Sequence, residues 1–174
     1  MSPDDINRLK TVHPDLRDRY LKAIALFKQT HGLDVRPTET FRSESQQMEY
    51  FKIGRVLNPT TRKWTVVGKT VTNALPRQSW HLFGLAIDSC FEGPDPYMEH
   101  IPTADADALW LALGEAFEAY ELTWGGRFKS VDRPLCELTY GLSLKDAQTL
   151  YAKSGVVAVW NKVDAIITCG GHLV

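Results

Sequence analysis

The chain has 174 residues, of which 44% are hydrophobic and 24% are charged, and its formal net charge is −1. This length and composition are typical of one globular domain with a sizeable core. The balanced charge argues against a nucleic-acid footprint or a polybasic membrane surface, and no apolar run is long enough to span a bilayer. We therefore expect one domain over residues 1–174, monomeric, without nucleic-acid binding or membrane insertion.

The cysteines and the N-terminus indicate the compartment. Three cysteines, Cys90, Cys136 and Cys169, are too few and too scattered for a disulfide framework, so we expect free thiols. The first residues lead directly into a charged helical pattern, and no signal peptide is visible. We expect the protein to be made in the cytoplasm, so that any target outside the cell is reached after release or export.

Helices are marked by their caps and by the spacing of apolar residues. Between Asp15 and Thr30 apolar side chains recur every three or four positions, which predicts one buried face. Gly32 is a typical C-terminal stop for that helix. N-caps are expected at Ser2, Ser43, Thr103 and Ser143. The predicted helices span residues 3–11, 15–30, 44–55, 103–120 and 143–153, the last ended by Gly155.

Short strands are predicted between these helices, at residues 33–41, 85–88, 122–124 and 135–139. A long irregular stretch over 56–78 holds one more candidate strand at 64–67 and is expected to line a cleft, with Lys69 and Arg77 as anion contacts. Periodicity does not decide whether residues 156–160 form a strand or begin a helix. We expect an α+β fold, a small antiparallel sheet with helices packed mainly on one side.

Residues 79–88, S-W-H-L-F-G-L-A-I-D, are the most informative stretch. His81 and Asp88 are seven positions apart, a spacing that does not stack two side chains on one helix face. The intervening glycine favours a loop that turns into a strand, on which Ala86 and Asp88 share a face. An imidazole and a carboxylate aimed at one point are ligands that zinc accepts. The simpler interpretation is a buried histidine hydrogen-bonded to an aspartate.

Several motifs occur in an order that resembles the M15 zinc peptidases, the VanY/D-Ala-D-Ala carboxypeptidase and phage endolysin type. They are F-R-S-x-x-x-Q at 41–47, G-R at 54–55, G-K-x-V-T-N at 68–73, S-x-H-x-x-G-x-A-x-D at 79–88, W-G-G at 124–126 and D-R-P-x-x-E-L at 132–138. The resemblance covers about residues 8–155 and leaves 156–174 as a C-terminal extension. It implies a hedgehog/DD-peptidase-like fold.

The resemblance also implies a function. Members are zinc-dependent hydrolases of peptidoglycan stem peptides, which cleave L-Ala–D-Glu in endolysin-type enzymes and D-Ala–D-Ala in carboxypeptidases. The short chain without a visible signal favours the bacteriophage endolysin type, which degrades the cell wall after release or export. By resemblance, His81 and Asp88 are zinc ligands and Asp132 is the general base. Arg42 and Ser43 bind acidic groups of the peptide, and Gln47 steadies the site.

One position departs from the family pattern. Asp132, Pro134 and Glu137 keep register with the family's D-x-P-H-F-E run, so Leu135 stands where the third zinc-ligand histidine is expected. A leucine cannot bind zinc. This departure leaves the metal site two ligands from the family set and puts catalysis in question.

Three replacements for that ligand can be weighed. Cys136 offers a thiolate, but on a regular strand it faces away from position 135, so a bulge would have to re-aim it. Glu137 would reach through a water, and Cys90 would approach from the other strand. The alternative is an inactive member that keeps the cleft to bind wall peptides or a protein partner. A serine hydrolase built on Ser79 lacks a nucleophile elbow.

Overall fold

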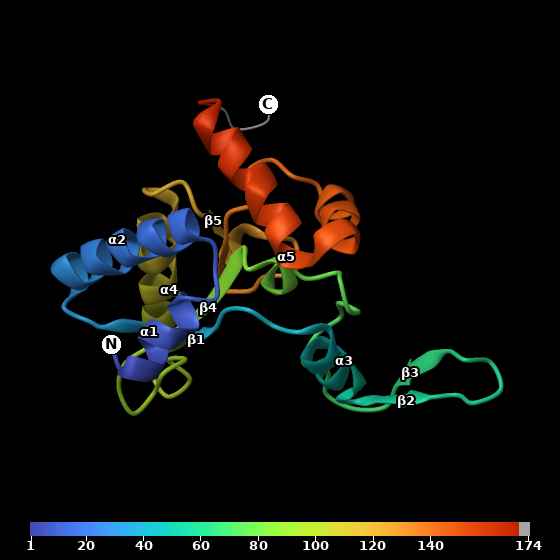
Figure 1. The fold of residues 1–174 in the computed structure, drawn as a ribbon. Coiled ribbons are helices and arrows are strands. Elements are labelled where there is room, and N and C mark those ends of the chain that lie inside the picture. Colours follow the sequence, from blue (N-terminus) through green and yellow to red (C-terminus); the bar gives the residue numbers. More distant parts are fainter. Residues whose placement is uncertain (171–174) are drawn as a thin grey trace.

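Figure 1 shows the computed structural model, in which residues 1–170 are described. None of the helices in this range combines the length and the apolar character that a bilayer crossing requires. The elements in chain order are α1 (Pro3–Leu9), α2 (Pro14–His31), β1 (Val35–Glu39), α3 (Glu44–Lys52), β2 (Arg55–Leu57), β3 (Trp64–Val66), the 3₁₀ turn η1 (Trp80–Phe83), β4 (Ala86–Phe91), α4 (Thr103–Glu118), β5 (Thr123–Trp124), the 3₁₀ turn η2 (Gly125–Arg127), β6 (Leu135–Glu137) and α5 (Leu144–Thr168).

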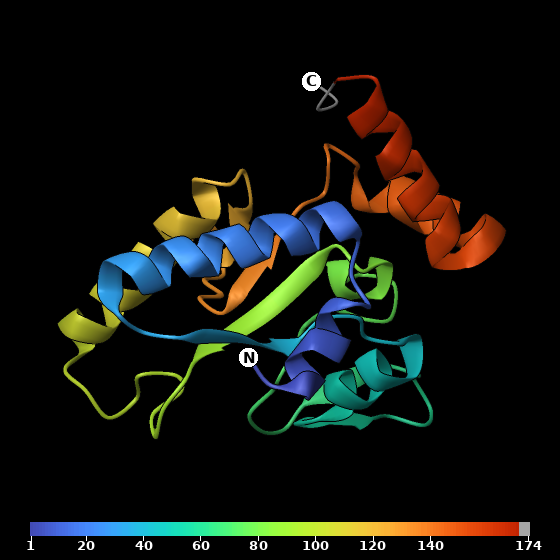
Figure 2. The ribbon, with the colours of Figure 1, turned by 60° about the vertical axis from the view of Figure 1, so that its left-hand side comes forward.

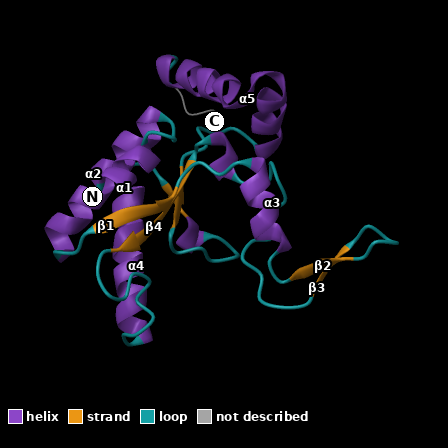
Figure 3. Cartoon of the chain, turned by 60° about the horizontal axis from the view of Figure 1, so that its bottom comes forward, coloured by secondary structure: helices purple, strands orange, loops and turns teal. Residues whose placement is uncertain are grey.

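The described residues form two sheets, and both are antiparallel. The main sheet has the strand order β1-β4-β6-β5, so β4 lies in its middle. The second sheet is the β2–β3 hairpin, which stands apart from the main sheet (Figure 3). The predicted α+β fold with a small antiparallel sheet is confirmed.

The core lies between the main sheet and the pair α2 and α4, and Figure 2 shows α2 running along the sheet. Aromatic rings tie these layers together. Tyr20 of α2 stacks on Phe117 of α4 with ring centroids 5.9 Å apart. Phe91 at the end of β4 contacts Phe27 at 5.7 Å and Trp110 at 4.6 Å. The helices therefore pack mainly on one face, as predicted, and leave the other face of β4 and β6 to a cleft.

Local signals set most helix starts. Ser2, Ser43 and Ser143 each accept the backbone N–H three residues later, in capping boxes. The predicted cap at Thr103 is wrong, because Pro102 occupies that position without a side-chain bond. The helix predicted over 44–55 ends at Lys52, since the following residues pair as β2 in the hairpin.

The C-terminal extension is a continuation of α5. Ser154 and Gly155 leave helical geometry, so the predicted stop is correct, but a second helical segment follows and runs to Thr168. This segment buries Val159, and its Trp160 indole N–H donates to the Phe83 carbonyl at 2.8 Å. The extension thus supports the turn η1. Its last residues, 171–174, lie outside the described range.

Candidate active site

A cleft of about 900 Å³ opens on the face of β4 and β6 that is turned away from α2 and α4. Its lining comes from segments far apart in the sequence and includes Arg42, His81, Asp88, Asp132, Leu135 and Glu137. Sequence analysis named all of these positions, and folding brings them together. The loop 56–78 contributes Val71, Thr72 and Ala74 to the same wall.

His81 is held by a tight turn. The turn ends at Gly84, whose φ is +64° and where an added Cβ would lie 3.0 Å from both the Thr11 carbonyl oxygen and the Trp160 ring. Only glycine satisfies both the left-handed backbone and the close approach. The imidazole Nδ1 lies 2.7 Å from the Thr40 carbonyl oxygen. A carbonyl only accepts, so Nδ1 carries a proton and Nε2 faces the cleft.

Nε2 of His81 meets the carboxylate of Asp88, with 3.4 Å between Nε2 and Oδ2. Burial lowers the pKa of His81, but the Asp88 carboxylate outweighs it and the net pKa is raised. Two acceptors this close need a proton or a cation between them. The pair fits the simpler interpretation of a hydrogen-bonded His and Asp, and the same two atoms are donors that a metal ion accepts.

Arg42 lies on the cleft floor with 8% of its surface exposed. Its guanidinium donates through Nε and Nη2 to the Glu39 carboxylate and through Nη1 to Gln47 Oε1, at 2.8 Å for the Nε and Nη1 bonds. The amide of Gln47 in turn donates to the Ala74 carbonyl at 2.7 Å.

Arg42 is thus paired with Glu39, a partner that sequence analysis missed, and its predicted contact with substrate stays a prediction. Ser43, also predicted to bind substrate, caps α3, because its hydroxyl accepts the backbone N–H of Gln46. Gln47 links Arg42 to the Ala74 carbonyl, and its expected steadying role stays a prediction. The only signal for the Glu39 contact was its position three residues before Arg42.

Asp132 reaches the cleft because the chain passes very close to Gly125. The Asp132 backbone N–H donates to the Gly125 carbonyl at 3.0 Å, and a Cβ on Gly125 would lie 2.4 Å from the Asp132 carbonyl oxygen. The first glycine of the W-G-G motif, Gly125, is therefore required because the Asp132 carbonyl oxygen occupies the space of a side chain. Although Asp132 as a residue is exposed, partial desolvation of its carboxyl in the cleft raises its pKa, and the nearby Asp88 carboxylate raises it further.

Leu135 and Glu137 share one face of β6. Leu135 is paired with Asp88, and Glu137 with Ala86. This register puts an isobutyl group beside the His81–Asp88 pair, where the family pattern has histidine. Burial raises the pKa of Glu137 to about 7, although nearby His81 acts in the opposite direction.

The thiol replacements for the third ligand are not brought to the cleft. Cys136 is fully buried in the core and is paired with Ile87 and Trp124, on the face of β6 opposite Leu135. The register between β4 and β6 is regular there, so no bulge re-aims it. Burial raises the pKa of Cys136 well above its ordinary value, which disfavours a thiolate. Cys90 is 1% exposed and lies opposite Arg36.

The described part of the chain contains no group of three or more His, Cys, Asp or Glu side chains placed to hold a metal ion. Catalytic zinc sites normally use three protein ligands. His81 and Asp88 supply two donors, and the carbon side chain of Leu135 supplies none. The residues present therefore do not fit the zinc site that the family resemblance implies.

Comparison with known proteins identifies the family. A family model described as D-alanyl-D-alanine carboxypeptidase, of M15 type, matches residues 72–134. The peptidoglycan L-alanyl-D-glutamate endopeptidase CwlK of Bacillus subtilis (strain 168) is 34% identical over 131 residues, which cover 73% of this chain and 69% of CwlK. The crystal structure of the Serratia marcescens L-Ala D-Glu endopeptidase ChiX matches with a TM-score of 0.48 and 22% identity, covering 80% of this chain and 90% of that one. The extent of identity to CwlK shows that this chain belongs to the M15 family of peptidases.

Proposed function

We propose that this protein is a peptidoglycan peptidase that cleaves the L-Ala–D-Glu bond of a stem peptide. The observation that carries the proposal is the convergence of His81, Asp88 and Asp132 in one cleft. The choice of bond follows CwlK, which is named for that bond and is 34% identical.

Asp132 is the proton acceptor in this proposal. Partial desolvation and the nearby Asp88 carboxylate raise its pKa, so the carboxylate is a stronger base than an unperturbed aspartate. It takes the proton of the attacking water. Glu137 lies on the same wall with a pKa of about 7, so a protonated fraction is present at neutral pH to protonate the leaving amine.

The zinc site implied by the family is altered in this chain, because only two of its ligands are present. His81 and Asp88 are the two side chains that would hold the ion, which would polarise the scissile carbonyl when bound. Because Leu135 removes the third ligand, we assign no step of the reaction to a metal.

A second function is favoured by Leu135 itself. An M15 chain that has lost a ligand and kept its cleft can act as a binding module for wall peptides or for a protein partner. The cleft stays lined by polar groups in either case. A peptidase would bind the wall peptide and cleave it, whereas a binding module would bind the peptide without cleaving it.

Digestion of purified peptidoglycan separates them. The wild-type chain is expected to release new D-Glu amino termini. Asp132→Ala is expected to lower that rate by about 100-fold or more, the usual contribution of a positioned base. Asp18→Ala, at an exposed aspartate of α2, serves as the matched control and keeps the full rate.

An undiminished rate in Asp132→Ala removes the assignment of the base. A wild-type chain that binds the wall without releasing amino termini establishes the binding function instead.

A further inference from the structure

Positive charge is concentrated in one segment of this chain. Residues 50–87 contain six basic side chains and no acidic one, whereas the other residues contain 14 basic and 21 acidic side chains. The near-neutral total therefore hides a strong separation of charge. The six are Lys52, Arg55, Arg62, Lys63, Lys69 and Arg77.

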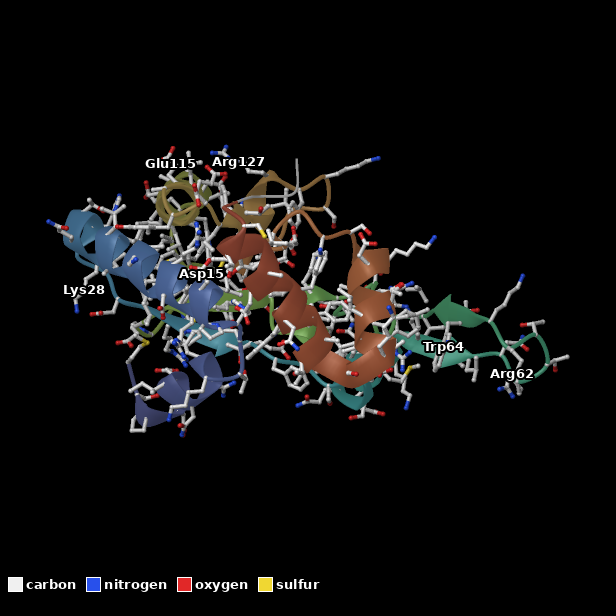
Figure 4. All side chains as sticks on the ribbon, turned by 45° about the horizontal axis from the view of Figure 1, so that its top comes forward. Asp15, Lys28, Arg62, Trp64, Glu115 and Arg127 are labelled. Carbon is white, nitrogen blue, oxygen red and sulfur yellow. The ribbon has the colours of Figure 1, made fainter. Side chains whose placement is uncertain are left out.

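The middle of this segment forms the β2–β3 hairpin, which projects from the body of the protein beyond α3 (Figure 1). Figure 4 shows Arg62 near the far end of the hairpin and Trp64 closer to the body. Trp64 anchors the base, because its ring packs edge-on against Phe51 of α3 with centroids 5.7 Å apart.

Three of the six cations already have partners. Arg55 donates to the carbonyls of Phe51 and Thr72 at 2.7 and 2.8 Å. Arg77 is paired with Glu44 at 2.9 Å, and Lys52 with Glu49 at 2.7 Å. The predicted anion contact of Arg77 is thus taken within the chain.

The other three, Arg62, Lys63 and Lys69, are exposed, and no acidic partner contacts them in the described range of residues 1–170. We call these three the basic arm. Exposed valines lie beside them, with Val66 at 61% and Val67 at 66%. A surface that combines free cations with apolar area is suited to a partner that is anionic and partly apolar.

The basic arm is continuous with the cleft. The chain leaves it at Lys69 and lines the cleft wall at Val71, Thr72 and Ala74. The cleft itself presents the carboxyl groups of Asp88, Asp132 and Glu137. Its two lining arginines already donate, Arg42 to Glu39 and Arg8 to the Thr38 carbonyl at 2.8 Å.

An anionic substrate that leaves such a cleft therefore meets uncompensated positive charge along the hairpin. We infer that the basic arm binds the free carboxylates of the peptidoglycan stem peptides outside the cleft, and so holds the polymer while the cleft engages one peptide. This inference rests on the proposed function. Exposed cations of this kind act through screened attraction, which raises the association rate and weakens with salt.

The test measures binding apart from cleavage. Chains carrying Asp132→Ala, which is expected to slow digestion, are sedimented with purified peptidoglycan freed of phosphate polymers. Arg62→Gln, Lys63→Gln and Lys69→Gln are combined in one variant. The matched control combines Lys145→Gln, Lys153→Gln and Lys162→Gln, three exposed lysines of α5.

The arm variant is expected to bind roughly tenfold more weakly at low ionic strength, with the difference shrinking as salt rises. The control variant binds as the parent does, and circular dichroism verifies that both are folded. Peptidoglycan whose carboxylates have been converted to amides is expected to bind the parent as weakly as native peptidoglycan binds the arm variant.

Equal binding by the arm variant and the parent overturns the inference, and so does unchanged binding to the amidated polymer. Binding that appears only when polyol-phosphate chains are left on the wall assigns the arm to phosphate instead of carboxylate. Self-association of the parent that the arm variant loses assigns it to a second copy of the chain. If the wild-type chain does not cleave peptidoglycan but binding still depends on the basic arm, only the proposed function is contradicted.

Discussion

The two faces of the β4–β6 pair differ in chemistry although they are one residue apart. On the cleft face Asp88 lies opposite Leu135, and on the core face Ile87 lies opposite Cys136. The residue with the right position for a third ligand has no donor atom, and the residue with a good donor atom points into the core. The alternation of strand side chains thus outweighs ligand chemistry in deciding which groups meet.

The largest expected effect restores the donor on the cleft face. Leu135→His is expected to raise zinc affinity by roughly a hundredfold or more, and to raise cleavage of muropeptides, because it completes a set of three ligands with His81 and Asp88. Zinc titration with a competing chelator measures the affinity. Leu135→Asn, which is polar but a poor zinc ligand, is the control.

If neither zinc affinity nor cleavage rises, a side chain at position 135, opposite Asp88, is not placed to bind a metal ion together with His81 and Asp88. A gain in affinity without a gain in cleavage means that another part of the machinery has been lost.

A smaller effect is expected from Glu137, two residues along the same face. Its pKa is raised from 4.5 to about 7, so the folded state binds more protons than the unfolded state in that window. Stability therefore falls as pH rises from about 4.5 to about 7. Glu137→Gln removes this loss and is expected to be more stable than wild type at pH 8 by roughly 1–3 kcal/mol.

Urea unfolding at pH 5 and at pH 8 measures the difference, with the exposed Glu115→Gln as control. If the advantage of Glu137→Gln is the same at both pH values, the carboxyl is not buried as described.

The smallest effect on the site is expected from the core face. Cys136→Ala leaves metal content unchanged, because the thiol lies on the side of β6 away from His81. It lowers stability by about 1–2 kcal/mol through the lost packing. Metal analysis and thermal unfolding measure the two quantities, and Cys169→Ala, at an exposed cysteine, is the control. If the wild-type chain binds metal and Cys136→Ala loses it, the thiol faces the cleft, and our assignment of the two faces is wrong.

Local chemistry made much of the fold predictable. Serine caps, glycine stops and apolar spacing marked where the helices begin and end, as at Ser43 and Gly32. The hairpin was harder to predict because β2 and β3 are only three residues each, and their exposed valines follow neither a helical nor a half-buried strand pattern. Residues 156–160 were ambiguous for the same reason, and packing against η1 accompanies their helical form.

For the site, the sequence by itself identified the candidate residues, and the alternation along one strand determined that Asp88 and Ala86 share a face. Only the tertiary structure decided which groups are left free to act. Arg42 is paired with Glu39, Cys136 is turned into the core, and the three cations of the basic arm have no acidic partner among residues 1–170. Backbone preferences are local and are written in neighbouring residues, whereas the partner of a charged or reactive side chain is set by segments that meet only after folding.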